Sequence, residues 1–469
     1  MRLPRIMIAA PASGSGKTLI TCGLLWAFAG RGKKPVSFKC GPDYIDPMFH
    51  RKVLGVPARN LDTFFTDAGM VRYLLGKAAV KADISVLEGV MGFYDGAGGI
   101  TDVASSYDVA RATDTPVILV IHAKGMSLSV LPLIQGFLTY RKDSRIAGVI
   151  LNQVTESAYR MLKGKIEQEL PIKVFGYVPF CTGLVLKSRH LGLVTPDEVK
   201  GLQDKLQAFS KVLEQTLDIE GILACAKGAA PISVEDPHWW KELRQPYKNQ
   251  KAPVKLGIAK DEAFCFCYEE NLELLQELGA QLSFFSLLHD KSLPSGLDGM
   301  ILYGGYPELY ARELSGNHKI KQQIHTCLTG GMPYLAECGG FLYLQESLED
   351  MEGNRYPMAG VYPGKAYRTQ KLGRFGYLTL TPRENGQLLP YGEHIKAHEF
   401  HYYDCTENGG SYHGAKPFSA REWDCIHGGR QYAAGFPHLY YYSNPAFAFH
   451  FVQQCRAYRR KLEKGRLWT

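Results

Sequence analysis

No apolar run in the sequence approaches the roughly 20 residues that a membrane-spanning helix needs. The N-terminal stretch MRLPRIMIAAPASG lacks the longer apolar core and the small-residue cleavage site of a signal peptide. The 11 cysteines are scattered and include no CxxC pair, as is typical of a reduced protein rather than a secreted disulfide scaffold. We therefore expect a cytoplasmic protein with no membrane partner.

Blocks of basic residues are also missing. The net charge of +8 is mild for 469 residues, so it fits an anionic substrate at least as well as nucleic acid, and no nucleic-acid partner is expected. A chain of this length is too long for one ordinary hydrophobic core, and two or three domains are expected. Nothing in the sequence fixes the oligomeric state.

Short apolar runs alternate with amphipathic stretches along both halves of the chain. This pattern predicts two α/β domains, the first around a mostly parallel sheet. We place the first domain at 1–218 and the second at 254–469. Between them, 219–253 is rich in Pro and charge, and it is expected to be a linker with a short helix near Trp239. The run AFAFHFVQQC is expected to be the last apolar segment of the second α/β series.

A glycine-rich loop follows the first predicted strand and precedes a predicted helix. It comprises Gly14, Ser15, Gly16, Lys17 and Thr18. Backbone N–H groups in such a loop converge on phosphate oxygens, Lys17 reaches the β/γ oxygens, and the Thr18 hydroxyl can ligate Mg²⁺. Pro11 occupies the first glycine position of the strict GxxxxGK[ST] pattern. The strand–loop–helix context nevertheless predicts ATP binding.

Acidic residues follow two further predicted strands. Asp43 and Asp46 lie in KCGPDYIDP, and Glu88 and Asp95 lie in LEGVMGFYDG. Because ligands gather at the carboxyl ends of parallel strands, these carboxylates are candidates to hold Mg²⁺ and to orient a substrate. Asp43 and Asp46 alternatively only cap turns. Asn152 also ends a strand, where its amide is a candidate to read an adenine edge.

A second site is predicted at YLAECGGFLYL. Cys338 lies between a predicted strand and a predicted helix, with Gly339 leaving room in the turn, as in a nucleophile elbow. The helix N-terminus favours a thiolate. His438 is a candidate base, and backbone N–H groups near Gly305 in GGYPE, together with Gly339, are candidates for an oxyanion hole. The alternative is that Cys338 is a small buried core residue.

These motifs together resemble one enzyme family. The resemblance is carried in family order by blocks that span nearly the whole chain: APASGSGKT, KCGPDYIDPMFH, RNLDTFF, LEGVMGFYDG, KSRHLGL, DEAFCFCYEENL, GGYPELYA, AECGGFLYL and EHIKAHEFHYYD. The sequence is similar to the cobyrinate a,c-diamide synthases of corrin biosynthesis and to related enzymes that amidate nickel-sirohydrochlorin or hydrogenobyrinate.

The resemblance implies a P-loop amidoligase domain similar to dethiobiotin synthetase, followed by a class I glutamine amidotransferase domain of flavodoxin-like α/β fold. It implies L-glutamine, ATP and a tetrapyrrole polycarboxylate as substrates, with Mg²⁺. ATP activates each carboxylate as an acyl phosphate, and ammonia released from glutamine by Cys338 and His438 displaces the phosphate. Asp43, Asp46, Glu88 and Asp95 hold metal and orient the substrate on this reading.

Three positions depart from the family pattern. Tyr440 stands two residues after His438, where many class I enzymes have Glu, so a Cys–His dyad is expected. His122 replaces a more usual Asp, and Cys267 replaces a more usual Tyr. Cobyric acid synthase, which amidates other side chains, is the nearest alternative in chemistry. A P-loop regulatory ATPase with a non-catalytic second domain is the alternative from another class.

Overall fold

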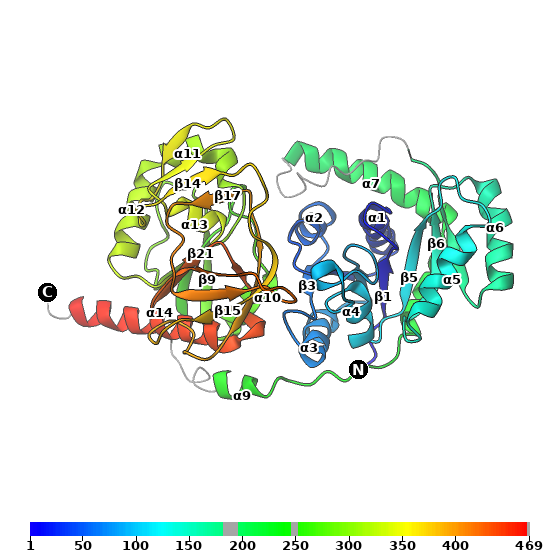
Figure 1. Ribbon diagram of the computed structural model, residues 1–469, viewed down its shortest axis with the longest axis horizontal. Helices are drawn as coiled ribbons and strands as arrows, with labels where there is room; N and C mark the ends of the chain where they lie inside the picture. The colour runs from blue at the N-terminus through cyan, green and yellow to red at the C-terminus, as the bar shows by residue number, and fades with distance from the viewer. Residues whose placement is uncertain (182–195, 245–251, 467–469) are drawn as a thin grey trace. The chain divides into compact units, whose positions relative to one another are not determined.

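A computed structural model describes residues 1–181, 196–244 and 252–466, which form two compact units (Figure 1). The first unit is Met1–Pro237 and the second is His238–Thr469. The block KSRHLGL lies outside the described residues. Within them, no helix is both long and apolar enough to cross a membrane.

The first unit is built on a seven-stranded sheet of order β3-β2-β4-β1-β5-β6-β7, in which every pairing is parallel. Its strands are β1 (Arg5–Ala9), β2 (Pro35–Cys40), β3 (Ala58–Leu61), β4 (Ile84–Glu88), β5 (Val117–His122), β6 (Ile146–Asn152) and β7 (Lys173–Val178). Strands β1, β2 and β4 are buried at every position. This burial on both faces explains why they are rich in apolar residues, with Lys39 and Glu88 among the buried polar exceptions.

Helices follow most of these strands. They are α1 (Lys17–Gly30), α2 (Ile45–Leu54), α3 (Ala68–Ala79), α4 (Ser106–Ala112), α5 (Val130–Tyr140), α6 (Glu156–Glu169) and α7 (Pro196–Thr216), with a 3₁₀ turn η1 (Ala97–Gly99). Helices α3, α4 and α6 begin where Asp67, Ser105 and Thr155 accept hydrogen bonds from first-turn N–H groups. Helix α7 packs against α1 and α2 (Figure 1).

The first unit extends beyond the predicted boundary at 218. Helix α8 (Ile219–Lys227) buries Ile219, Ile222 and Ala226 in the core of the first unit, where it contacts β1, β4 and β7. The apolar residues recur at helical spacing, a signal that the Pro-rich composition further along obscured. The prediction that the linker begins at residue 219 is therefore wrong, because α8 belongs to the first unit. The expected short helix near Trp239 is α9 (Trp239–Arg244).

The second unit is built on a six-stranded sheet of order β20-β21-β11-β10-β8-β9. Its strands are β8 (Val254–Ala259), β9 (Ala280–Phe285), β10 (Gly299–Leu302), β11 (Tyr334–Glu337), β20 (His427–Gly428) and β21 (Tyr432–Gly435). All pairings are parallel except β20 with β21. The flanking helices are α10 (Glu269–Glu277), α11 (Ala311–Gly316), α12 (His318–Thr329), α13 (Gly339–Tyr343) and α14 (Pro445–Arg466), with 3₁₀ turns η4 (Pro307–Tyr310) and η5 (Tyr441–Ser443).

Two smaller sheets complete the second unit. One has the order β13-β12-β14-β17 and comprises β12 (Ser347–Glu349), β13 (Arg355–Pro357), β14 (Lys365–Arg368) and β17 (Tyr403–Cys405). The other has the order β19-β18-β15-β16-β22 and comprises β15 (Phe375–Pro382), β16 (Ile395–Phe400), β18 (Tyr412–Ala415), β19 (Glu422–Cys425) and β22 (His438–Leu439). The second of these sheets is antiparallel throughout and carries His438.

The run AFAFHFVQQC is helical, not a strand of the α/β series. It belongs to α14, whose buried residues Phe447, Phe451 and Cys455 recur every four positions. Pro445 stands at the first helical position, and Asn444 accepts a hydrogen bond from Ala446 N. The signals at the helix start and the period of four decide for a helix.

Candidate active sites

The glycine-rich loop joins β1 to α1 in the backbone conformation that phosphate binding requires. Gly14 and Gly16 have φ values of 76° and 94°, which L side chains rarely adopt. The side chain of Asn152 donates a hydrogen bond to Ser15 O at 2.8 Å, and a methyl group placed on Gly16 would lie 2.5 Å from its Nδ2. Asn152 thus braces the loop, a contact different from the adenine contact expected for it.

Lys17 and Asp95 meet where a second loop folds against the first. Phe93 N donates to Ala10 O at 2.8 Å, and Asp95 accepts from Gly92 N at 2.9 Å. The Lys17 ammonium donates to Met91 O at 2.5 Å. Burial, reinforced by a nearby lysine, lowers the pKa of Lys17 to about 8. The structure therefore brings Lys17 and Asp95 to the same edge of the sheet.

A buried charge cluster lies beside the loop. The Thr18 hydroxyl donates to Glu88 at 2.5 Å, and the Lys39 ammonium lies 2.5 Å from Asp46 and 3.0 Å from Glu88. His50 Nε2 is 3.5 Å from the other Glu88 oxygen. These side chains come from α1, β2, α2 and β4, so the parallel sheet gathers residues that are up to 70 positions apart.

The electrostatics of the cluster are set by burial and by Lys39. Burial, with Asp46 nearby, raises the pKa of Glu88 to about 7 and that of Asp43 to about 6. Burial would also raise the pKa of Asp46, but its contact with Lys39 lowers it below the ordinary value. Asp43 also accepts from Ile45 N at 2.8 Å, so it makes a turn contact just before α2, as the alternative interpretation expected of Asp43. Carboxylate and hydroxyl oxygens are ligands that Mg²⁺ prefers, but Lys39 engages Asp46 and Glu88 here, and among the described residues no group of three or more His, Cys, Asp or Glu side chains is arranged to hold a metal.

Lys39 and His50 are components that the sequence analysis did not single out. Both are buried, at 5% and 0% exposure. A lysine inside the otherwise apolar strand PVSFKC was the available signal, because a buried ammonium requires carboxylate partners. The neighbouring Asp46 and Glu88 are those partners.

Replacing Lys39 with methionine is expected to destabilise the first unit by about 3–5 kcal/mol, because Asp46 and Glu88 stay buried without a cation. Chemical denaturation followed by circular dichroism measures this change. Lys165→Met is the matched control, since its ion pair with Glu169 is exposed and is worth at most about 0.5 kcal/mol. Equal effects of the two substitutions would contradict the assigned importance of the buried cluster.

The second site is centred on Cys338, which stands between β11 and α13 with φ 46° and ψ −106°. Its N–H donates to Gly435 O at 2.8 Å, and its carbonyl accepts from Leu342 N at 2.9 Å. The side chain is only 6% exposed and belongs to the hydrophobic core of the unit. Cys338 is therefore on a sharp elbow, as the nucleophile hypothesis predicts, and it is also buried, as the core-residue alternative predicts.

Two glycines show how closely the catalytic candidates approach one another. A methyl group placed on Gly304 would lie 2.3 Å from Cε1 and 3.2 Å from Nε2 of His438, and 3.3 Å from Cβ of Cys338. One placed on Gly339 would lie 2.9 Å from Gly305 N. The structure thus places the His438 ring and Cys338 on either side of Gly304, and Gly305 N close to Gly339 at the elbow. This is the geometry expected of a base and an oxyanion hole.

The charge state of this pair differs from the sequence-based expectation. Burial, together with the charges of Glu308 and Glu399, raises the pKa of the Cys338 thiol, although the Gly339 N–H opposes the shift. Burial lowers the pKa of His438 to about 3. Helix α13 has only five residues, so its N-terminus does not outweigh desolvation. The pair therefore rests as a neutral thiol and a neutral imidazole.

The three departures from the family pattern have distinct places. The Tyr440 hydroxyl donates to Glu270 at 3.3 Å and its ring packs against Tyr268. His122 is exposed at the end of β5, opposite Asn152 in the sheet register. Cys267 is buried.

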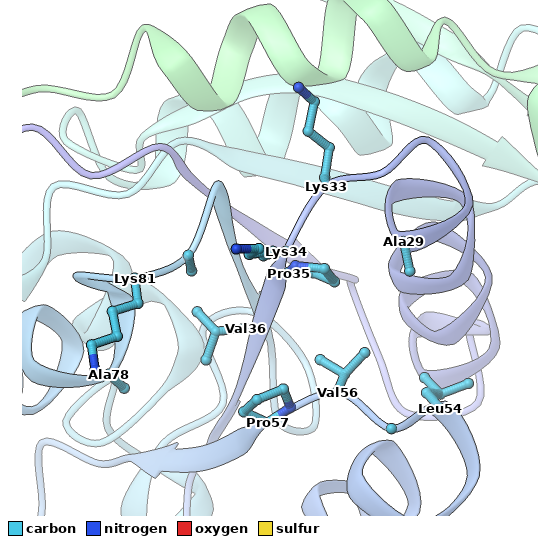
Figure 2. Close-up of a pocket in the computed structure, with 12 residues that line it drawn as sticks. Ala29, Lys33, Lys34, Pro35, Val36, Leu54, Val56, Pro57, Ala78 and Lys81 are labelled. Atoms are coloured by element: carbon cyan, nitrogen blue, oxygen red, sulfur yellow. The ribbon is translucent and has the colours of Figure 1, made fainter.

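A pocket in the first unit lies away from these residues. Figure 2 shows its lining, which includes Lys33, Lys34 and Lys81 around Val36 and Val56. It opens where β2 begins at Pro35, whereas Lys39 and the phosphate loop lie at the opposite ends of their strands. None of the predicted site residues lines it.

Fold and sites together define a nucleotide-binding unit joined to a glutamine amidotransferase unit. Residues 6–193 match the family model of the CobQ/CobB/MinD/ParA nucleotide binding domain. Residues 255–422 match that of the CobB/CobQ-like glutamine amidotransferase domain. A protein that combines these two domains is an amidating enzyme.

Curated relatives narrow this class to one family. The chain is 39% identical to the cobyrinate a,c-diamide synthase of Caldanaerobacter subterraneus, over 97% of this chain and 99% of the relative. It is 36% identical to that of Thermoplasma volcanium, over 99% and 100%, and 34% identical to that of Priestia megaterium, over 97% and 98%. The chain belongs to the cobyrinate a,c-diamide synthase family.

Proposed function

We propose that this enzyme amidates the a and c side-chain carboxylates of a corrin-type tetrapyrrole, as a carbon–nitrogen ligase with glutamine as the amide donor. The observation that supports this most strongly is similarity to cobyrinate a,c-diamide synthases along both units. A mildly basic chain also suits a polyanionic substrate. All 11 cysteines are thiols rather than disulfides, as is typical of proteins in a reducing compartment, and this supports a cytoplasmic location.

In the second unit, Cys338 releases ammonia from glutamine. The thiol proton passes to Nε2 of His438 while the sulfur attacks the side-chain amide carbon. The oxyanion that forms is stabilised by the N–H groups of Gly305 and Gly339. His438 then gives its proton to the departing nitrogen, which leaves as ammonia. Water hydrolyses the remaining thioester to glutamate and restores the thiol.

In the first unit, the acceptor carboxylate is made electrophilic. Its oxygen attacks the γ-phosphorus of ATP, ADP leaves, and an acyl phosphate forms. The backbone of residues 14–18 and the Lys17 ammonium bind the phosphates. Ammonia then attacks the acyl carbon, and inorganic phosphate leaves to give the amide.

The residues that would hold Mg²⁺ are Thr18, Asp43, Asp46 and Glu88. All four contribute oxygen atoms from hydroxyl or carboxylate groups, which Mg²⁺ prefers. When bound, the ion offsets the negative charge of the phosphates. Asp95, which approaches Lys17 from the neighbouring loop, is proposed to orient the acceptor.

Mass spectrometry of the reaction product tests the proposal. The enzyme is incubated with ATP, Mg²⁺ and glutamine against cobyrinate, hydrogenobyrinate and nickel-sirohydrochlorin in parallel. Two successive amidations of cobyrinate are expected. Preference for another macrocycle reassigns the substrate within the family. Amidation at other side chains indicates a cobyric acid synthase activity, and nucleotide hydrolysis without amidation indicates a regulatory ATPase.

A further inference from the structure

We propose that Glu337, the residue directly before the nucleophile, is the acidic partner that positions His438. This inference rests on the proposed glutaminase chemistry and adds a third member to the expected Cys–His dyad. Glu337 Oε2 lies 3.7 Å from His438 Nδ1. Both side chains are buried, at 4% exposure for Glu337 and 3% for His438.

The two ring nitrogens of His438 face different partners. Nε2 and Cε1 lie beside Gly304, close to the Cβ of Cys338. Nδ1 lies on the Glu337 side. A carboxylate that accepts from Nδ1–H fixes the tautomer in which Nε2 carries the lone pair, and that is the nitrogen that must take the thiol proton. The contact is thus placed where an orienting acid is needed.

The fold makes this arrangement from adjacent residues. Glu337 ends β11 and pairs with Gly435 in the sheet register, while Cys338 begins the elbow. His438 arrives three residues after β21 on the short strand β22. The end of one parallel strand therefore supplies the acid and the nucleophile, and the chain leaving its neighbour supplies the base.

The position that holds an acid in many class I enzymes has another use here. Tyr440, two residues after His438, donates its hydroxyl to Glu270 and packs on Tyr268. It is 0% exposed and carries no carboxylate. Glu337 therefore takes over a role that Tyr440 cannot fill.

Burial opposes the charge of Glu337, and neighbouring hydrogen bonds support it. Burial raises the pKa of Glu337 well above its ordinary value, while the Leu439 N–H and the Tyr441 hydroxyl stabilise the anion. The Tyr303 hydroxyl interacts with Tyr441 behind it. A carboxylate there is least costly when His438 holds the proton taken from Cys338, which is the state that glutamine attack creates.

The rate of glutamine hydrolysis by the Glu337→Gln variant tests the assignment. The glutamine side chain has nearly the shape of glutamate but cannot carry its negative charge. We expect kcat to fall by roughly 10²- to 10⁴-fold with little change in KM. The pH profile should also shift, and alkylation of Cys338 by iodoacetamide should slow. Ammonium-driven synthesis in the first unit should be retained. Glu337→Asp, which restores the carboxylate, should recover part of the loss and of the alkylation rate.

Glu270→Gln is the matched control, a buried glutamate of the same unit whose partner is Tyr440. An equal loss in both variants, or a Glu337→Gln enzyme within threefold of the parent, would overturn the proposal. If Glu337→Gln does not fold, the pH profile of Cys338 alkylation in Glu337→Asp decides, and an unchanged profile overturns it. Glutamine hydrolysis can be measured without a macrocycle. If the enzyme amidates no tetrapyrrole, the proposed function is refuted, but the role of Glu337 in glutamine hydrolysis is still tested.

Discussion

Replacing Cys338 with serine is expected to lower glutamine-dependent amidation by at least about 10³-fold while leaving amidation driven by ammonium salts. The hydroxyl is a much weaker nucleophile than the thiol, and the elbow keeps its backbone conformation because serine is nearly the same size. The residues proposed to carry the synthetase reaction, Lys17, Thr18 and Glu88, lie in the other unit, so the substitution leaves them unchanged. Product formation with each nitrogen source, measured on one preparation, gives the two values.

Cys327→Ser controls for the substitution itself, because Cys327 is a half-buried residue of α12 away from the elbow. That variant should keep both activities. If Cys338→Ser lost ammonium-driven synthesis as well, the assignment of two separable half-reactions would be wrong.

The complementary change is Lys17→Ala. Synthesis should fall by about 10²-fold or more with either nitrogen source, because the ammonium that we propose to bind the β/γ phosphates is missing. Glutamine hydrolysis should continue, since Cys338, His438 and the oxyanion glycines belong to the second unit. Coupled assays for ADP and for glutamate separate the two effects.

Lys33→Ala is a suitable control for this experiment. Lys33 lies at the pocket of Figure 2, away from the phosphate loop of the same unit. It should leave synthesis near the parent rate. Full synthesis by Lys17→Ala would refute the phosphate-binding role of residues 14–18.

The parts of the sites that follow from local sequence were predictable. Strand, glycine-rich loop and helix are consecutive at Gly14–Thr18, and strand, cysteine and glycine pair are consecutive at Cys338. In both cases the chemistry is carried by the backbone geometry of one short segment. The two-unit α/β fold was predictable for the same reason, because most of the buried strands are largely apolar runs bounded by turns.

The site residues that were not predicted from the sequence depend on which strands become neighbours in the sheets. Lys39 gains its meaning only when β2 pairs with β4 and sets the lysine beside Glu88. Glu337 acquires a role only because β22 returns His438 to the end of β11, about a hundred residues later. A single sequence does not show which strands pair. Lys39 and Glu337 therefore look like ordinary polar residues in the sequence.

The backbone conformation at Cys338 has a consequence for the stability of the second unit. A non-glycine residue with positive φ outside the favoured wells costs on the order of 1–3 kcal/mol, and this cost is present in the folded state whether or not glutamine arrives. The only residue that would relieve it is glycine, which has no nucleophile. The folded domain therefore carries a strain energy at Cys338 that surrounding hydrogen bonds must offset. A substitution that removed this strain would make the domain more stable and the enzyme inactive.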